Sequence, residues 1–365
     1  MSFKVFEEYI DKSFDEKIGI VNSIYNKIYG NDIIQEYLDD DLVDEIMINS
    51  FDEIYIEKNG IIVKVENSFL NKEKLMDLIY RIVSEVNRQV NTTSPIVDAR
   101  LSDGSRVNVV LDPISIKGPS VTIRKFKKKC YSLEELKLKN AFNEKILKFL
   151  IHIIKHNFNI FISGGTSSGK TTLLNALSNH INHNERIITI EDSAELKFWE
   201  HDNVISLETR NSNFSKNSEI TIADLIKASL RMRPDRIIVG EVRSFEAIDM
   251  IQAMNTGHDG SLSTGHGNSN IDMLYRLETM ILSNAKYPIE AVRNQITSGI
   301  DILINIKRYK DSVRRISAID LIESSSVNGY KLRNLFSTIY DVQNCEYKII
   351  ESGEAYEEIL KKFYR

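Results

Sequence analysis

An eight-residue segment, GGTSSGKT at residues 164–171, has the composition and spacing of a phosphate-binding loop. It matches G-x-x-x-x-G-K-[ST], in which glycines let successive backbone N–H groups face one anion while the following helix points its positive end at the same phosphates. Lys170 is expected to reach the β- and γ-phosphates, and Thr171 to ligate Mg²⁺. The predicted nucleotide-binding residues are Gly164, Gly165, Thr166, Ser167, Ser168, Gly169, Lys170, Thr171 and Thr172.

The sequence favours ATP over other nucleotides as the ligand of this loop. No [NT]KxD segment that would read guanine is present, and neither is an LSGGQ-like signature of transporter ATPases. We therefore predict an ATPase with ATP and Mg²⁺ as its cofactors.

A second acidic element, RIIVGEVR at residues 236–243, ends an apolar strand. ATPases with such loops commonly place Asp-Glu here, with the aspartate near magnesium and the glutamate orienting the attacking water. Gly240 stands where that aspartate is expected, so Glu241 is the predicted catalytic carboxylate. The alternative is a surface glutamate that pairs with Arg243.

Glu191 is a candidate for the missing carboxylate. It follows the apolar run IITI in ITIEDSAEL, and ligands of parallel sheets gather at the carboxyl ends of the strands. We predict that Glu191 faces the nucleotide as a catalytic residue and as an outer-shell ligand of Mg²⁺.

The segment GHDGSLSTGHGNS, residues 257–269, supplies two histidines among four glycines. Such a segment makes a poor hydrophobic strand but suits a backbone held close to a phosphate. His266 lies between Gly265 and Gly267 and is predicted to donate a hydrogen bond to the γ-phosphate, whereas His258 is the weaker candidate.

The elements around these motifs indicate an α/β nucleotide-binding core. FNIFIS, RIITIED and DRIIVGEV are apolar strand candidates separated by helical segments, which is typical of a parallel sheet covered on both faces. Before this core, DEIYIEK and IIVKVEN flank Asn59-Gly60 as a predicted hairpin, followed by a helix at 72–90 and strands in SRVNVVL and PSVTIRKF. The predicted division is a helical segment at 1–37, an α+β domain at 38–124, a linker at 125–140 with a helix start at Ser132, and the ATPase domain at 141–365.

Composition is consistent with two domains. The 365 residues carry a net charge of −5, 42% hydrophobic residues and two cysteines, with no uninterrupted apolar run long enough for a membrane span. The first residues lack the basic start and apolar run of a secretory signal, so we expect a cytoplasmic protein. The widely separated Cys130 and Cys345 argue against a disulfide framework or a zinc site.

Taken together, the four motifs resemble the Walker A, Asp box, atypical Walker B and His box of the secretion-superfamily ATPases of type II and type IV secretion and type IV pili. The stretches SPIVDARLSDGSRVNVV, GPSVTIRKF and RMRPDRIIVGEVR are most similar to the CpaF-type ATPase of tight-adherence (Flp) pili. The resemblance covers about residues 44–320. The tetracysteine module of many type II secretion ATPases and the AIRLAE-like motif of retraction motors are absent.

This resemblance implies an N-terminal domain joined to a RecA-like P-loop core in a homo-hexamer, with ATP bound between the domains. Arginines of the N-terminal domain reach the phosphates in this family, and Arg106 and Arg124 match them, with Arg100 as a third candidate. Alternatively, these arginines form surface ion pairs. The resemblance also implies peripheral association with the inner face of the cell membrane, through an inner-membrane platform protein, to power pilus assembly or secretion.

Three alternatives remain open from the sequence. A conjugation-type secretion ATPase is the nearest. The basic run at residues 124–129 suggests a nucleic-acid motor, although the acidic net charge argues against one and no nucleic-acid partner is expected. The third is a nucleotide-gated scaffold without turnover.

Overall fold

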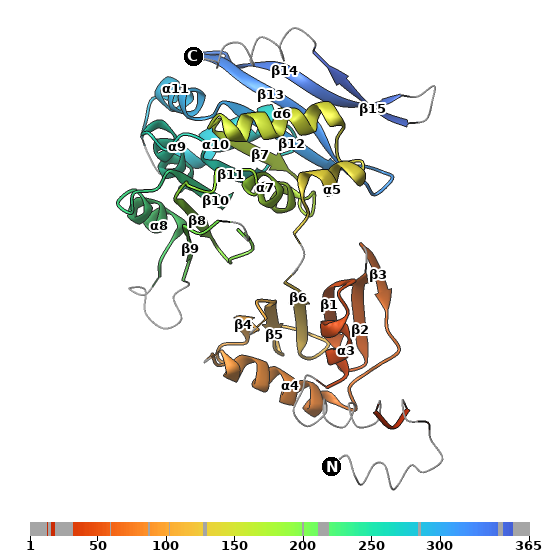
Figure 1. Cartoon of the computed structure of the whole chain (residues 1–365). Coiled ribbons are helices and arrows are strands. Elements are labelled where there is room, and N and C mark those ends of the chain that lie inside the picture. The colour runs from red at the N-terminus through yellow and green to blue at the C-terminus, as the bar shows by residue number, and fades with distance from the viewer. Residues whose placement is uncertain are drawn as a thin grey trace. The chain divides into compact units, whose positions relative to one another are not determined.

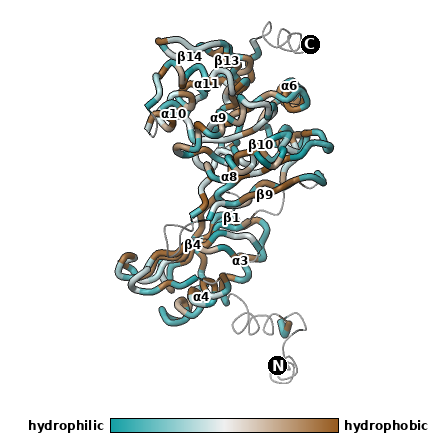
Figure 2. The backbone as a smooth tube through the Cα atoms, turned by 90° about the vertical axis from the view of Figure 1, so that its left-hand side faces the viewer, coloured by the Kyte–Doolittle hydropathy of each residue, from teal (hydrophilic) through white to brown (hydrophobic). Residues whose placement is uncertain are grey.

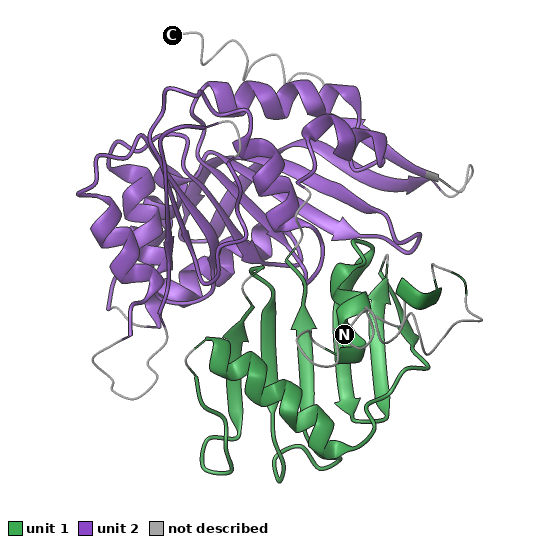
Figure 3. Ribbon diagram, turned by 60° about the horizontal axis from the view of Figure 1, so that its bottom comes forward, with its two compact units in different colours: residues 1–129 green, residues 130–365 purple. Residues whose placement is uncertain are grey.

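The chain divides into two compact units in a computed structural model, residues 1–129 and 130–365 (Figure 3). The structure describes residue 13 and residues 16–18, 32–58, 60–86, 88–101, 103–126, 130–198, 201–210, 219–283, 286–341 and 346–352. Most of the predicted helical segment at 1–37 therefore lies outside the described residues. Each unit is described by itself below.

Unit 1 is built on a six-stranded antiparallel sheet, in the order β3-β2-β1-β6-β5-β4 (Figure 1). Its strands are β1 (Val43–Ser50), β2 (Glu53–Lys58), β3 (Ile61–Lys64), β4 (Ile96–Arg100), β5 (Arg106–Val110) and β6 (Ser120–Arg124). Two short helical segments, η1 (Asp32–Ile34) and α3 (Gln35–Asp39), precede them. The buried strand positions pack against α4 (Lys72–Glu85), whose apolar face includes Leu75, Leu78, Ile79 and Ile82.

The predicted hairpin around Asn59-Gly60 is confirmed, because β2 and β3 pair antiparallel and Gly60 has φ +80°. The predicted helix at 72–90 was too long. It begins at the cap Asn71, whose side chain accepts from the backbone N–H of Lys74, and it ends at Glu85. Its alternation of hydrophobic and hydrophilic residues can be followed in Figure 2. The strand β4 was not predicted.

Unit 2 contains a nine-stranded sheet in the order β15-β14-β13-β12-β7-β11-β10-β8-β9. Six neighbouring strands of this sheet pair in parallel. At the β12 edge of these six, three further strands continue the sheet by antiparallel pairing. The parallel strands are β7 (Ile160–Gly164), β8 (Ile187–Glu191), β9 (Val204–Glu208), β10 (Arg236–Val242), β11 (Leu262–His266) and β12 (Ile302–Arg308). The antiparallel strands are β13 (Arg314–Ser326), β14 (Gly329–Asp341) and β15 (Glu346–Glu351).

Helices cover both faces of this sheet, as predicted for a parallel core (Figure 1). One buried cluster joins the sheet to α5 (Leu133–Leu138), α6 (Glu144–Lys155) and α7 (Lys170–Ser178). The other joins it to α8 (Ile222–Ser229), α9 (Ala247–Asn255), α10 (Asn270–Leu282) and α11 (Ile289–Gly299). Within the described residues, no helix is both long and apolar enough to cross a membrane.

Part of the predicted linker at 125–140 is a helix of unit 2. Ser132 caps α5 in a reciprocal capping box with Glu135, as the sequence indicated, and Leu133 is fully buried in the core. A capped helix with a buried leucine is structured, so the predicted linker extended too far toward the C-terminus.

Candidate nucleotide-binding site

The GGTSSGKT segment forms the connection from β7 to α7, where a phosphate-binding loop requires it. Ser167 and Gly169 have φ values of +56° and +102°, which turn the backbone sharply before the helix begins. A Cβ on Gly164 would lie 2.5 Å from the carbonyl oxygen of Ile306 and from Ser168 Oγ, so only glycine fits there. No side chain caps the N-terminus of α7, which leaves its N–H groups to a ligand.

Two features of the loop fit a phosphate ligand. Lys170 is buried, and its Nζ lies 3.0 Å from the carbonyl oxygen of Gly165 and 3.3 Å from that of Gly164, which holds the cation over the loop. Ser168 Oγ is buried and has no hydrogen-bond partner within the described part of the chain. Burial lowers the pKa of Lys170, with Glu241 opposing that shift.

Glu241 and His266 meet directly at the carboxyl ends of the neighbouring strands β10 and β11. His266 Nε2 lies 2.7 Å from Glu241 Oε1, and His266 Nδ1 lies 3.4 Å from Lys170 Nζ. Because the lysine can only donate, Nδ1 must accept and Nε2 must carry the proton. The contacts thus form one chain from the loop lysine through a neutral imidazole to the carboxylate.

The surroundings of His266 disfavour its protonated form. Burial lowers its pKa, and nearby Lys170, Arg243 and Arg276 act in the same direction, while Glu241 opposes them. The role of His266 as a hydrogen-bond donor to the γ-phosphate stays a prediction, and in this structure a carboxylate oxygen lies next to the Nε2 that would donate.

Arg243 joins Glu241 to the acidic segment after β8. Its guanidinium lies 2.7 Å from Glu241 Oε2 and 2.9 Å from Asp192 Oδ2. The ion pair expected in the alternative interpretation of Glu241 therefore exists, alongside the histidine contact. Arg243 was not predicted as a site residue, although its position two residues after Glu241 was a usable signal.

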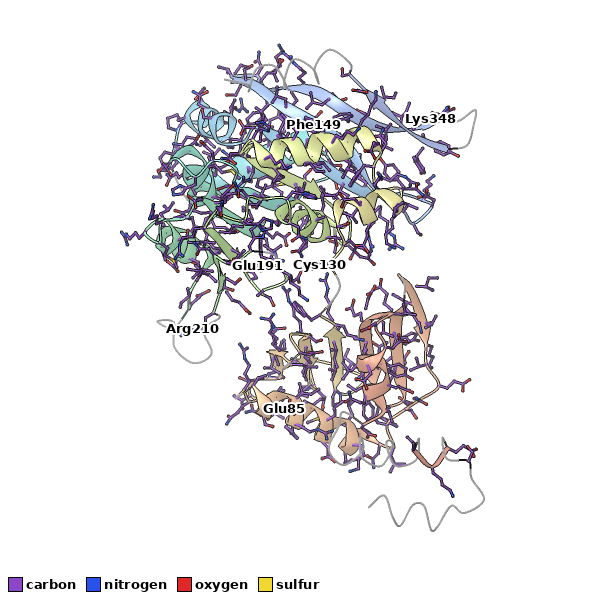
Figure 4. The ribbon with its side chains drawn as sticks, viewed as in Figure 1. Glu85, Cys130, Phe149, Glu191, Arg210 and Lys348 are labelled. Carbon is purple, nitrogen blue, oxygen red and sulfur yellow. The ribbon has the colours of Figure 1, made fainter. Side chains whose placement is uncertain are left out.

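Glu191 lies beside Gly240, at the place left by the missing aspartate. The side chain of Glu191, which is labelled in Figure 4, is buried. A Cβ on Gly240 would lie 2.9 Å from Glu191 Cγ. Glu191 Oε1 accepts from the backbone N–H groups of Glu195 at 3.0 Å and Leu196 at 3.2 Å. A carboxylate from the neighbouring strand thus fills the space of a side chain at position 240. Its catalytic and outer-shell roles stay predictions.

We expect Gly240→Ala to destabilise the protein by about 1–3 kcal/mol, because the new methyl group overlaps a buried, hydrogen-bonded glutamate. Thermal unfolding measures this. Gly165→Ala is the control, since an added Cβ there meets nothing within 4 Å. Equal stability of the two variants would contradict the packing of Glu191 against Gly240.

The segment at residues 257–269 was predicted to make a poor strand, but part of it is a strand in the structure. Residues 262–266 form β11, the central strand between β7 and β10. Gly265 is tightly packed there, since a Cβ would lie 2.8 Å from Met273 Cε and 3.0 Å from Phe161 Cε1. His258 precedes β11 and contacts the carbonyl oxygen of Ala253 through Nδ1, so it lies at the opposite end of the strand from His266.

A buried polar network beneath the loop escaped the sequence analysis. Ser163, the residue before the loop, donates to Asn270 Oδ1 at 2.9 Å and accepts from Asn305 Nδ2 at 2.7 Å. Asn270 in turn donates to Asp320 Oδ2 at 2.7 Å. These side chains connect β7 to α10, β12 and β13, and no local sequence pattern indicates this network.

Three predicted arginines lie side by side in unit 1. Arg100 is opposite Arg106, and Arg106 is opposite Arg124, on the adjacent strands β4, β5 and β6. Arg100 Nε donates to the carbonyl oxygen of Gly104 at 3.1 Å, and Arg124 is exposed. The sheet therefore gathers the three cations in one row, and their contact with a nucleotide remains a prediction.

Residues 28–346 match the family described as "Type II/IV secretion system protein". The probable conjugal transfer protein TrbB of Sinorhizobium fredii is 32% identical over 301 residues, covering 81% of this chain and 88% of that protein. The type IV secretion system protein PtlH homolog of Bordetella bronchiseptica is 30% identical over 76% of this chain and 89% of its own length. An uncharacterised protein of Methanocaldococcus jannaschii is 40% identical over 238 residues, and this chain spans only 33% of its length.

Solved structures share the fold. The pilus retraction motor PilT with bound ADP aligns with a TM-score of 0.56 and 20% identity, covering 91% of this chain and 87% of PilT. The Legionella pneumophila ATPase DotB gives a TM-score of 0.56 at 19% identity, covering 90% of this chain and 82% of DotB. The predicted α/β, RecA-like core with a second domain is thus confirmed. On the match over residues 28–346, the chain belongs to the type II/IV secretion system protein family.

Proposed function

We propose that this protein binds ATP and Mg²⁺ and hydrolyses ATP to power a secretion or pilus-assembly machine. The observation that carries the proposal is the contact chain Lys170–His266–Glu241 beside a phosphate-binding loop. A cation, a neutral donor and a carboxylate meet there at the carboxyl ends of three adjacent parallel strands, which is where ligands of such sheets bind.

Each side chain has a role that its surroundings support. Lys170 and the N–H groups at the start of α7 bind phosphate, and the Thr171 hydroxyl and Glu191 are the candidate holders of Mg²⁺. The metal would neutralise charge that develops on the phosphates. Glu241 Oε2 accepts a hydrogen bond from Arg243, which fixes the carboxylate, and Oε1 accepts none from the described residues, so it is suited to orient a water.

His266 is suited to sense the γ-phosphate. Its Nε2 lies 2.7 Å from Glu241 Oε1, and an incoming phosphate oxygen would compete with that carboxylate for the imidazole. A contact to the γ-phosphate that forms in only one conformation makes that conformation bind ATP more tightly than the other. This difference in affinity shifts the protein toward that conformation when ATP binds and releases it after hydrolysis. We propose that this change, together with Arg106 and Arg124 on the phosphates, moves the subunits of a homo-hexamer.

The pathway is the finer part of the proposal. Relatives named for conjugal transfer and type IV secretion favour a conjugation-type system, whereas the resemblance of several segments to CpaF-type ATPases favours a tight-adherence pilus. In both, we propose a cytoplasmic motor held at the inner face of the membrane by a platform protein. Cross-linking in native cells to a polytopic membrane protein tests this, and capture of nucleic acid with stimulated turnover would instead support a nucleic-acid motor.

Lys170→Ala is expected to lower ATP affinity by about a hundredfold or more, because charge-assisted hydrogen bonds to two phosphates are lost. Isothermal titration calorimetry and a phosphate-release assay measure binding and turnover. Lys155→Ala removes an exposed lysine from the last turn of α6 and serves as the control. ATP binding by Lys170→Ala at wild-type strength would contradict the site, and binding without phosphate release by the wild type would indicate a scaffold.

A further inference from the structure

Asn270, the first residue of α10, joins the two segments that carry Lys170 and His266. It comes shortly after His266 in the chain, and its Oδ1 accepts a hydrogen bond from Ser163 Oγ at 2.9 Å. Ser163 immediately precedes Gly164, the first residue of the phosphate-binding loop. One amide side chain therefore connects the segment after the histidine to the start of the loop.

The other atoms of the Asn270 amide are fixed as well. Its Nδ2 donates to the carbonyl oxygen of Leu303 at 3.2 Å and to Asp320 Oδ2 at 2.7 Å. Asp320 is held in turn by a second asparagine, because Asn334 Nδ2 donates to Asp320 Oδ1 at 2.7 Å. Asn270 is only 2% exposed. A buried amide whose oxygen and nitrogen are both engaged has one orientation, so Ser163 meets a fixed acceptor.

The chain between His266 and Asn270 lies against the start of the loop. His266 pairs with Gly164 in the register of β11 and β7, and the backbone N–H of Gly267 donates to the carbonyl oxygen of Gly164 at 3.3 Å. Strand pairing thus places the backbone of His266, and Asn270 fixes the end of the segment that follows it. The 3.4 Å contact between His266 Nδ1 and Lys170 Nζ joins these same two segments.

We propose that Asn270 is a positioning residue that keeps His266 in contact with the loop lysine and thereby sets the turnover of ATP rather than its affinity. This inference rests on the proposed function, because it takes His266 to act on bound ATP. Lys170 and the N–H groups of the loop bind the phosphates without Asn270, so the affinity depends on it little. A small displacement of a group that meets the reacting phosphate, by contrast, slows the reaction strongly.

Asn270→Ala is expected to lower kcat by about tenfold while the dissociation constant for ATP changes by less than about threefold. Steady-state phosphate release and calorimetry with the full chain measure the two quantities. Asn334→Ala is the matched control, since it removes an amide from the other oxygen of Asp320. This control also loses a hydrogen bond of the network, but its kcat should stay within about twofold of wild type.

A double-mutant cycle with His266→Ala separates positioning of the histidine from simple support of α10. If Asn270 acts through His266, adding Asn270→Ala to His266→Ala should lower kcat by less than about twofold further, because no imidazole is left to position. Ser163→Ala approaches the same contact from the loop and removes a single oxygen atom, so it keeps the test usable if Asn270→Ala does not fold. It should also lower kcat, and its effect should not add to that of Asn270→Ala.

Wild-type kcat in Asn270→Ala or in Ser163→Ala would overturn the inference. So would a full further loss of kcat in the His266→Ala background, or equal losses of kcat in Asn270→Ala and Asn334→Ala, since Asn270 would then only support the fold. A loss of ATP affinity as large as the loss of kcat would overturn it as well. These results leave the proposed ATPase intact, because wild-type binding and phosphate release still report on it. A wild type that binds no ATP would remove the proposed function and this inference together.

Discussion

Glu241→Gln is expected to bind ATP with nearly wild-type affinity while its turnover falls by about a hundredfold or more. The carboxylate is the acceptor suited to orient the attacking water, and losing such a group commonly costs at least that factor. The amide keeps one oxygen that can accept from His266 Nε2–H, so the binding surface is largely preserved. Calorimetry gives the affinity, and steady-state phosphate release gives kcat.

Two comparisons make this result specific. Glu290→Gln makes the same chemical change on the exposed first turn of α11 and should leave turnover unchanged. Wild-type kcat in Glu241→Gln would remove Glu241 from the mechanism and leave its ion pair with Arg243 as a structural contact. A parallel loss of ATP affinity would mean that the carboxylate positions Lys170 or His266 rather than water.

Local sequence patterns predicted the elements that are determined by residues close together in the sequence. The apolar runs ending at Gly164, Glu191 and Val242 are strands β7, β8 and β10, and the loop between β7 and α7 follows from its glycines. Asn-Gly between two alternating runs predicted the β2–β3 hairpin. In each case the signal lies within about ten residues of the chain.

The missed elements depend on contacts between distant residues. β11 has a glycine-rich, polar sequence, and it is central because β7 and β10 pair with it on both sides and Met273 packs on Gly265. The order of the strands, which brings His266 between Lys170 and Glu241, is likewise a property of the whole sheet. No local pattern shows that Arg314 donates to the carbonyl oxygen of Ser167 in the loop, 147 residues earlier.

Gly240 illustrates how the two kinds of information combine. The sequence showed that an expected aspartate is missing, and it named Glu191 as the substitute from its place after a strand. The structure explains the exchange sterically, because the side chain of Glu191 fills the space that a residue at 240 would need. A carboxylate at both positions would place two charges in one buried space, which is costly. A carboxylate therefore fits at position 191 or at position 240 of this chain, but not at both.

Arg236 is a further residue that the sequence did not single out, and it concerns stability rather than chemistry. It begins β10 and is completely buried. Its guanidinium forms an ion pair with Glu185 and donates to the carbonyl oxygens of Ile154 at 2.9 Å and Gly260 at 3.3 Å. One side chain thus joins the end of α6, the segment before β8 and the loop before β11, at the end of β10 opposite Glu241.

Gly260 packs closely against the guanidinium of Arg236. Its φ is +83°, and a Cβ there would lie 2.6 Å from Arg236 Nη1. Removing the guanidinium would leave Glu185 without its cation and would take one donor from the buried carbonyl groups of Gly260 and Ile154. Since a buried ion pair that loses one partner typically costs about 3–5 kcal/mol, the loss exceeds that of most single substitutions.

We therefore expect Arg236→Met to lower the thermal unfolding midpoint by about 10 °C, which corresponds to that cost for a unit of this size. Differential scanning calorimetry measures the shift. Lys148→Ala removes an exposed lysine, 3.8 Å from Glu144, and should change the midpoint by less than about 2 °C. The double variant Arg236→Met with Glu185→Met should recover part of the loss, because the uncompensated carboxylate is gone. If the single and double variants unfold at the same temperature, the cost arises from the lost carbonyl contacts, and the ion pair itself contributes little.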